Sequence, residues 1–378
     1  MKKIAVLASS LILIATSNSA LAFETSAKQA IIVDYDTQQV LFEKNANEKM
    51  PTSSMSKVIT AYAVMKEIKE GNITLDDKFR VSEKAWKKGG SKMFVEVGKD
   101  VRVEDLLRGV IIQSGNDATI VLAEGIAGTE DQFAVYLNKL AEQMGMDNSN
   151  FMNASGWPDE NHYSTARDLA TLGRHIITDF PEYYGIYSET EFTFNGITQQ
   201  NRNPLLYMDI GADGIKTGHT EIAGYGLMAS AKNDKTGRRV VVVFNGTDSK
   251  KARSEEAEKL VSYGLNGFKN QVFIDKDEDE YKVPVLFGQK EHVLAQASED
   301  LILTIEKLSE DDYTSKFTPK PSLEAPVTKG TQIGMIEVFK KGKSFKTIQV
   351  IAKEDVAELG TFKKWIAKAK HKFANRDK

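Results

Sequence analysis

Residues 51–60 read PTSSMSKVIT, and this stretch determines how the rest of the chain is interpreted. It predicts a helix after Pro51, because apolar residues recur there at helical spacing, at Val58, Ala61, Tyr62 and Met65. We expect Ser54 at the start of this helix and Lys57 one turn later, on the same face. The amine of Lys57 could then take the hydroxyl proton of Ser54, while free backbone N–H groups at the helix N-terminus stabilise negative charge. The stretch therefore predicts an activated serine.

A Ser-x-x-Lys pair alone is a weak signal, but two further motifs follow it in order. Residues 114–116 read Ser-Gly-Asn, and residues 216–218 read Lys-Thr-Gly. Ser114 offers a hydroxyl that could relay protons, and Asn116 offers an amide that could hold a substrate carbonyl. A serine hydroxyl is a weak nucleophile that needs a base and a site that stabilises charge. The ordered set of three motifs therefore indicates acyl-transfer chemistry.

The third motif adds charge and space to this set. Lys57 can act as a base only if burial or nearby positive charge lowers its pKa, and we expect Lys216 to supply such a charge. On a sheet edge, Lys216 and Thr217 would offer a cation and a hydroxyl to a substrate carboxylate. Gly218 would let a peptide-like ligand approach the backbone closely.

Residues 23–268 are predicted to form one α+β domain that combines helices with an antiparallel sheet. Two strands around a turn are expected at 30–35 and 40–42, and two more at 224–230 and 239–244. We expect the Lys-Thr-Gly motif to precede or open the strand at 224–230. A pair of helices that meets near residues 114–116 is expected within 104–127, followed by helices at 132–144 and 165–177.

Residues 269–358 are predicted to form a small all-β domain. An acidic stretch at 275–280 leads into short apolar or alternating runs divided by turn signals. These runs lie at 283–287 and 301–305, and at 333–338 paired with 345–352. A Pro-rich loop is expected at 318–326.

The first 22 residues are typical of a secretory signal peptide. Lys2 and Lys3 precede an apolar run at 4–15, and residues 20–22 read Ala-Leu-Ala, a small-x-small cleavage site. An uncleaved anchor is the alternative, but the run is too short to span a bilayer comfortably as a helix. We therefore expect an exported protein.

Residues 359–378 are predicted to form a basic amphipathic helix. Its apolar face contains Phe362, Trp365, Ile366, Ala369 and Phe373. Residues 361–378 carry a net charge of +6, which leaves −11 on residues 23–360. This distribution argues against nucleic acid as a partner of the main surface. The helix would suit a membrane interface with anionic lipid; packing on the protein body is the alternative.

The absence of cysteine removes disulfides, thiolate catalysis and cysteine-ligated metals. The five histidines show no paired spacing of the HExxH kind. We therefore expect neither a metal nor a cofactor.

The motifs and their surroundings resemble the low-molecular-weight penicillin-binding proteins, specifically the serine-type D-alanyl-D-alanine carboxypeptidases. The matching stretches are 51–60, 93–94, 106–118, 163–169, 191–203, 213–220 and 223–231. The resemblance covers the whole chain, including signal, small β domain and tail. It implies a β-lactamase/DD-peptidase-like fold, with an antiparallel sheet flanked by helices and a helical subregion that bears the Ser-Gly-Asn loop.

The resemblance also implies roles for single residues. Ser54 would be the acylated nucleophile and Lys57 its base, with Ser114 and Asn116 as the second motif. Lys216 and Thr217 would hold the terminal carboxylate of the substrate. The backbone N–H groups of Ser54 and His219 would form an oxyanion hole.

Two arginines match family positions but leave alternatives open. Arg253 would help to bind the terminal carboxylate, or it would be an exposed helix charge of little energetic value. Arg202 would be a site residue or a structural hydrogen-bond donor. Arg108 and Asp117, which flank the second motif, are expected to be structural ion-pair partners.

The activity that the resemblance implies is removal of the terminal D-alanine from peptidoglycan stem pentapeptides, with acylation by penicillins. A D,D-endopeptidase with the same site is the alternative, and a β-lactamase is a more distant one. Ser-Gly-Asn replaces the lactamase Ser-Asp-Asn, and Glu191 with Asn195, expected in a strand, is a poor candidate for a deacylation base. A non-catalytic wall-binding module is the remaining hypothesis.

Overall fold

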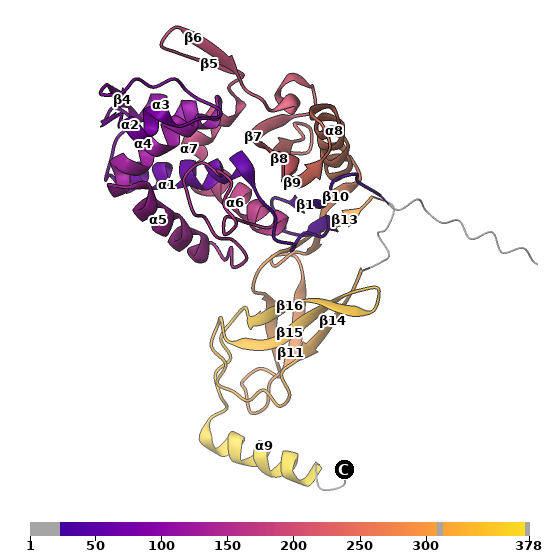
Figure 1. Ribbon diagram of the computed structural model, residues 1–378. Helices are drawn as coiled ribbons and strands as arrows, with labels where there is room; N and C mark the ends of the chain where they lie inside the picture. Colours follow the sequence, from indigo (N-terminus) through magenta and orange to yellow (C-terminus); the bar gives the residue numbers. More distant parts are fainter. Residues whose placement is uncertain (1–22, 308–312, 375–378) are drawn as a thin grey trace, which may run out of the picture.

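The computed structural model describes residues 23–307 and 313–374, so the predicted signal peptide lies outside the described residues. Figure 1 shows a larger body of helices and strands, a smaller β body below it, and the helix α9 (Thr361–Ala374) beyond that. The α+β class and the order of the two bodies are as predicted. The larger body contains the three motifs.

A five-stranded antiparallel sheet forms the centre of the larger body, in the order β2-β1-β9-β8-β7. Its strands are β1 (Gln29–Asp34), β2 (Val40–Lys44), β7 (Ala212–Thr220), β8 (Gly224–Lys232) and β9 (Arg239–Thr247). The Lys-Thr-Gly motif lies inside β7, a strand of its own that pairs with β8. The prediction that it precedes or opens the strand of β8 was wrong. The expectation of a sheet edge is confirmed, because β7 ends the order.

Both faces of this sheet are buried. Successive side chains of a strand point to opposite faces, and Ile31 and Ile32 accordingly belong to two different apolar clusters. On one face, Ile32 packs in a cluster with Leu260 and Val261 of α8 (Lys250–Asn266). On the other face, Ile31 lies in the main core, with helices such as α1 and α6.

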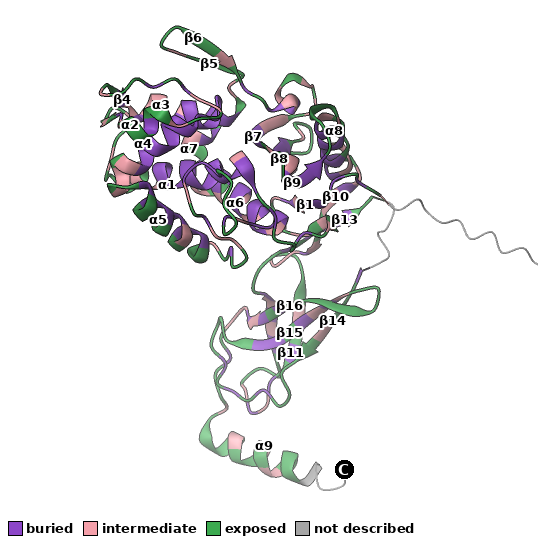
Figure 2. Cartoon of the chain, viewed as in Figure 1, coloured by how far each residue is buried: buried purple, intermediate pink, exposed green. Residues whose placement is uncertain are grey.

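The helix α1 (Lys57–Lys69) lies in the middle of the main core. Its residues from Lys57 to Met65 are all buried, and Figure 2 shows this segment in the buried colour. The N-terminal part of α1 therefore lies in the core, which fixes Lys57 there while Ser54, just before the helix, stays partly exposed. The remaining helices of the larger body are α2 (Glu83–Lys87), α3 (Val103–Ile111), α4 (Asn116–Ala127), α5 (Glu130–Gln143), α6 (Ala166–Asp179) and α7 (Pro181–Tyr184).

Short elements complete the larger body. Two antiparallel pairs of short strands join β3 (Lys78–Arg80) with β4 (Asp100–Arg102), and β5 (Glu191–Phe194) with β6 (Ile197–Gln200), the second pair being a hairpin. Three 3-10 turns are η1 (Ser53–Ser56), η2 (Gly185–Ser188) and η3 (Pro204–Tyr207). Glu191 lies in a strand, as expected.

The smaller body is built around a second five-stranded antiparallel sheet, in the order β11-β12-β16-β15-β14. Its strands are β11 (Glu280–Pro284), β12 (His292–Ala297), β14 (Tyr313–Pro319), β15 (Gln332–Lys340) and β16 (Lys343–Ala352). The predicted pairing of the last two runs is confirmed as β15 with β16. The expected loop at 318–326 begins two residues later, because Thr318 and Pro319 end β14.

The two bodies meet at a separate pair of strands, β10 (Phe268–Ile274) and β13 (Leu301–Glu306). The buried Arg238 donates to Asp34 at 2.7 Å and also to the carbonyl oxygen of Phe268, where β10 begins. The amide side chain of Gln39 contacts both the backbone N–H and the carbonyl oxygen of Thr304 in β13. This buried polar network fixes the smaller body against the larger one.

The helix α9 (Thr361–Ala374) ends the described chain. Its Phe362 and Trp365 are 76% and 72% exposed, and Figure 2 shows most of the helix in the exposed colour. His371 and Lys368 contact the ring of Phe287 in the smaller body. Among the described residues, no helix has the length and apolarity needed to cross a membrane.

Candidate active site

The serine turn η1 lies flat against the edge strand β7. A Cβ at Gly218 would lie 2.9 Å from the carbonyl oxygen of Thr52 and 3.1 Å from Cγ of Met55, which is closer than side-chain carbons normally approach. Gly218 therefore allows the third motif to lie directly beside the first. Met55, in the same turn, is fully buried and holds the turn on the core. Ser54 is left partly exposed at the start of α1.

Lys57 is oriented toward Ser54 by two hydrogen bonds. Its Nζ lies 2.9 Å from Oγ of Ser54 and donates to the carbonyl oxygen of Ser155 at 2.7 Å. Burial, together with the smaller effects of the charges of Arg202 and Lys88, lowers the pKa of Lys57 to about 7. A large fraction of Lys57 is therefore neutral near neutral pH, so the pair has the geometry and the protonation state of a nucleophile and its base.

Lys216 is not the residue whose charge lowers the pKa of Lys57. The cations that act on Lys57 are Arg202 and Lys88, and burial lowers the pKa of Lys216 itself well below its ordinary value. Lys57, Arg202 and Arg253 lower it further. The charge that Lys216 was predicted to supply is therefore not among those that lower the pKa of Lys57; the effect runs the other way, from Lys57 to the buried amine of Lys216.

The loop that holds Lys57 comes from a segment that sequence reasoning missed. Gly156 has a positive φ of 76°, and a Cβ there would lie 1.8 Å from the carbonyl oxygen of Ser53. The loop therefore needs glycine to bring the Ser155 carbonyl to Lys57. The same segment contains the buried His162, whose Nε2 lies 2.8 Å from Oγ of Ser56 and whose Nδ1 accepts from the backbone of Met152. No motif spacing could have indicated these contacts.

The second motif begins between α3 and α4, and Ser114 lines the same cleft as Ser54. Ser114 is buried, has a φ of 60°, and its hydroxyl has no hydrogen-bond partner among the described residues. An unpaired buried hydroxyl is costly, and strained residues of this kind concentrate at functional sites. Nδ2 of Asn116 donates to the carbonyl oxygen of Gly89 at 2.9 Å.

The two charged neighbours of this motif differ in role. Arg108 pairs with Glu104 and Glu189, so the prediction of a structural ion-pair partner is confirmed. The prediction was wrong for Asp117. Its carboxylate accepts backbone N–H bonds from residues 93–95, because it is fully buried beside that loop, where amide groups need acceptors.

A cleft of about 550 Å³ opens on one side of Ser54 and is lined by cations. Arg202, Lys250 and Arg253 line it together with Ser114 and the residues of the third motif from Thr217 to His219. Arg253 is 8% exposed, and its Nε has no hydrogen-bond partner among the described residues. The alternative of an exposed helix charge was wrong. A buried, incompletely paired guanidinium beside a nucleophile is suited to a carboxylate ligand.

Arg202 and His219 lie at the walls of the same cleft. Nη1 of Arg202 donates to Oγ of Ser91 at 2.6 Å, so this side chain both lines the cleft and makes a structural hydrogen bond. The ring of His219 stacks on Tyr225, which also lines the cleft, with 3.9 Å between the centroids. Glu191 lies in the exposed hairpin β5–β6, outside the residues that line the cleft.

The family models match nearly the whole described chain. A model described as D-alanyl-D-alanine carboxypeptidase matches residues 15–248, and a model described as penicillin-binding protein 5, C-terminal domain, matches residues 268–358. The chain is 38% identical over 346 residues to a D-alanyl-D-alanine carboxypeptidase, DacA, of Haemophilus influenzae, covering 90% of this chain and 88% of the relative.

Solved structures give the same assignment. Penicillin-binding protein 5 from Haemophilus influenzae is 37% identical, with a TM-score of 0.80, over 89% of this chain and 98% of that one. Penicillin-binding protein D2 from Listeria monocytogenes in an ampicillin-bound form is 27% identical, with a TM-score of 0.59, over 65% of this chain and 99% of that one. Because the matches span both bodies of the fold, the chain belongs to the serine D-alanyl-D-alanine carboxypeptidase family.

Proposed function

We propose that this carboxypeptidase cleaves the last peptide bond of peptidoglycan stem pentapeptides through an acyl-enzyme on Ser54. The observation that carries the proposal is the 2.9 Å contact between Nζ of Lys57 and Oγ of Ser54 at the end of a cationic cleft. A nucleophile within hydrogen-bond reach of a base with a lowered pKa is the arrangement that covalent catalysis needs. The cleft supplies a place for the free carboxylate of the substrate.

Acylation begins with the substrate carboxylate in the cationic cleft. Arg253, Thr217 and Lys216 hold it, with Arg202 at the wall, since charge-assisted hydrogen bonds to carboxylates are strong and directional. Neutral Lys57 takes the proton of Ser54 as Oγ attacks the carbonyl carbon between the two D-alanines. The backbone N–H groups of Ser54 and His219 stabilise the oxyanion.

The tetrahedral intermediate then collapses. The C–N bond breaks, and the leaving amine of D-alanine takes up a proton that Lys57 and the hydroxyl of Ser114 can deliver. The acyl group stays on Ser54 as an ester. In the second half, water loses a proton to the same base, attacks the ester carbon, and releases the shortened peptide while Ser54 regains its proton. Asn116 holds the acyl chain of the substrate in both halves.

Penicillins enter the same sequence of steps. Their strained amide occupies the position of the scissile bond and their carboxylate the cationic cleft, so Ser54 opens the ring and keeps the acyl group. The ampicillin-bound relative from Listeria monocytogenes supports this assignment. Glu221 lines one of the clefts that contain Ser54, but it is exposed, and the group that contacts Oγ of Ser54 is Lys57. We therefore expect slow loss of the adduct.

The test is release of D-alanine from a pentapeptide that ends in D-Ala-D-Ala, with the mass of the protein measured after exposure to penicillin. We expect stoichiometric D-alanine and a single covalent adduct. Absence of D-alanine would contradict the proposal. A crosslinked dimer muropeptide tests the endopeptidase alternative, and rapid turnover of penicillin without a lasting adduct would favour a β-lactamase.

We further propose that the exported protein is held at the periplasmic face of the inner membrane by α9. Phe362 and Trp365 are exposed on a helix whose other faces are rich in lysine, which suits an interface with anionic lipid. Removal of the residues after Leu359 is expected to abolish flotation with vesicles that contain anionic lipid, while D-alanine release in solution persists. Substitution of Phe362 and Trp365 by serine is the matched control that keeps every charge. If the truncated protein floats as well as the full chain, α9 is not the anchor.

A further inference from the structure

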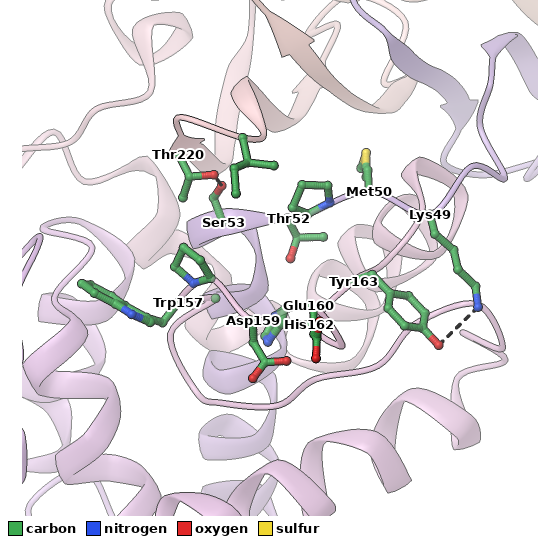
Figure 3. Close-up of a pocket in the computed structure, with 14 residues that line it drawn as sticks. Lys49, Met50, Thr52, Ser53, Trp157, Asp159, Glu160, His162, Tyr163 and Thr220 are labelled. Carbon is green, nitrogen blue, oxygen red and sulfur yellow. Dashed lines mark hydrogen bonds between the residues drawn. The ribbon is translucent and has the colours of Figure 1, made fainter.

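The larger body contains a cavity that is separate from the region around the nucleophile. Figure 3 shows a cavity of about 670 Å³ that belongs to that region, since Ser53 of the serine turn and Thr220 of β7 line it. A different cavity, of about 290 Å³, shares no lining residue with it or with the two clefts that Ser54 lines. We call it the α6 cavity, because it lies between α6 and the strands β1, β2 and β9. It is thus on the β2 side of the sheet, whereas the third motif is in the opposite edge strand, β7.

The floor of the α6 cavity is a row of three valines. Val40 of β2 pairs with Val33 of β1, and Val33 also pairs with Val241 of β9. Directly paired residues point to the same side of a sheet, so the three side chains lie next to one another. Ile31, two positions before Val33, continues this floor along β1. Val40 is 40% exposed, so the apolar floor is open to solvent at this edge.

One face of α6 forms the opposite wall. Its lining residues follow the spacing i, i+3, i+4 and i+7, which places them on the same side of the helix: Arg167, Ala170, Thr171 and Arg174. His175 lines the cavity as well. The described residues that line it include no aspartate or glutamate. A basic wall therefore faces an apolar floor.

Of the three basic side chains in this wall, Arg174 is the one without a partner among the described residues. Arg167 forms an ion pair with Glu43, and Nδ1 of His175 lies 2.9 Å from Oδ2 of Asp179. Nε of Arg174 is buried and has no hydrogen-bond partner. A buried donor that stays unpaired costs free energy, and an anionic acceptor in the cavity would remove that cost.

We propose that the α6 cavity binds a small apolar monocarboxylate, with the carboxylate on Arg174 and the hydrocarbon part on the valine floor. One unpaired guanidinium matches one negative charge, and arginine can donate two parallel N–H bonds to a carboxylate. A volume of about 290 Å³ is at the lower end of the range for small-molecule sites, so the ligand is a short alkyl chain or a single ring. Burial of its hydrocarbon part supplies most of the affinity. This site lies apart from Ser54 and does not depend on the proposed reaction.

The test is titration of the protein with octanoate and with benzoate, followed by ligand-observed NMR. The two probes distinguish an alkyl chain from an aromatic ring. We expect at least one of them to bind with a Kd of about 1 mM or lower. It should also raise the thermal midpoint, because a ligand that binds only the folded state stabilises it. The matching neutral amide, octanamide or benzamide, should bind about tenfold more weakly, since it lacks the charge that pairs with arginine.

Two variants test the two halves of the site. Arg174→Gln should weaken binding of the carboxylate about tenfold and leave binding of the amide unchanged. Thr171→Leu should weaken both probes, because the larger apolar side chain fills the cavity without changing its charge. Neither variant removes an ion pair, so the thermal midpoints of the free proteins should stay close to that of the natural chain.

The control is Arg253→Gln, which removes a cation from the catalytic cleft, the other place where a carboxylate could bind. It should leave the affinity of the α6 cavity unchanged. Failure of both carboxylates to bind the natural chain would overturn the proposal. Equal affinity in the natural chain and in Arg174→Gln would also overturn it. Binding that is lost in Arg253→Gln but kept in Arg174→Gln would assign the carboxylate to the catalytic cleft instead.

Discussion

Substitution of Ser54 by alanine is expected to lower D-alanine release by about 10⁴-fold or more, because no ester can form without Oγ. The side chain is partly exposed and, among the described residues, its hydroxyl makes one hydrogen bond, to Lys57, so we expect its removal to leave the packing of η1 unchanged. The measurement is kcat/KM for a pentapeptide, together with the protein mass after incubation with penicillin. The variant should carry no adduct, while its thermal midpoint stays close to that of the natural chain.

The neighbouring Ser53 provides a matched control. Oγ of Ser53 lies 3.2 Å from Oγ1 of Thr220 rather than beside Lys57, and Ser53 belongs to the same turn, η1. Ser53→Ala should still acquire the penicillin adduct, on the peptide that contains Ser54. An adduct on Ser54→Ala, or D-alanine release within tenfold of the natural rate, would show that another residue is the nucleophile.

The sequence predicted the parts of the fold that depend on strong local patterns. The helix after Pro51 and the strands of β1, β8 and β9 follow from apolar periodicity, and the structure places them within a few residues of the predicted bounds. The strands β10, β12 and β14 were not predicted individually. Many residues of β10 and β14 are exposed or partly exposed, so alternation along these two strands is weak. The strand β12 alternates in burial, but Val293 is its one β-branched residue.

Within the site, the sequence could identify motif residues but not the environment that activates them. The lowered pKa of Lys57 depends on its burial, with smaller effects from Arg202 and Lys88, and these residues come from three separate segments. The carbonyl of Ser155 that orients Lys57 lies 98 positions later in the chain. Contacts of this kind leave no local pattern, because they are set by how helices and loops pack.

The role of Asp117 could not be predicted from the sequence for the same reason, because it depends on packing between distant segments. A carboxylate next to a motif and close to Arg108 suggests an ion pair when only the sequence is considered. In the folded chain, Asp117 is enclosed at the start of α4 and faces three backbone amides, whereas Arg108 points toward Glu104 and Glu189. Asp117 thereby fixes the loop at residues 93–95, which lies beside the second motif. Its role is to hold that loop in place.

Replacement of Lys57 by methionine is expected to lower the rate of penicillin acylation by about 10²- to 10⁴-fold, the usual contribution of a positioned base. Methionine retains much of the buried volume without an amine. In the natural chain the rate should rise with pH through a midpoint near 7, since only neutral Lys57 accepts a proton and its pKa is about 7. The variant should lose this dependence. The measurement is the second-order acylation rate between about pH 5.5 and 9.

Replacement of Lys88 by methionine tests the effect of a neighbouring charge on the pKa of Lys57 without removing the base itself. Lys88 lies with Nζ 4.2 Å from the ring centroid of Trp157, and its charge lowers the pKa of Lys57. Lys88→Met should therefore keep the pH dependence but move its midpoint upward, because removing a positive charge favours the protonated form of Lys57. A Lys57→Met variant that is acylated with an unchanged midpoint would assign the base to another group, and the buried Lys216 would be the first to examine. A midpoint that moves downward in Lys88→Met would contradict the electrostatic origin of the lowered pKa.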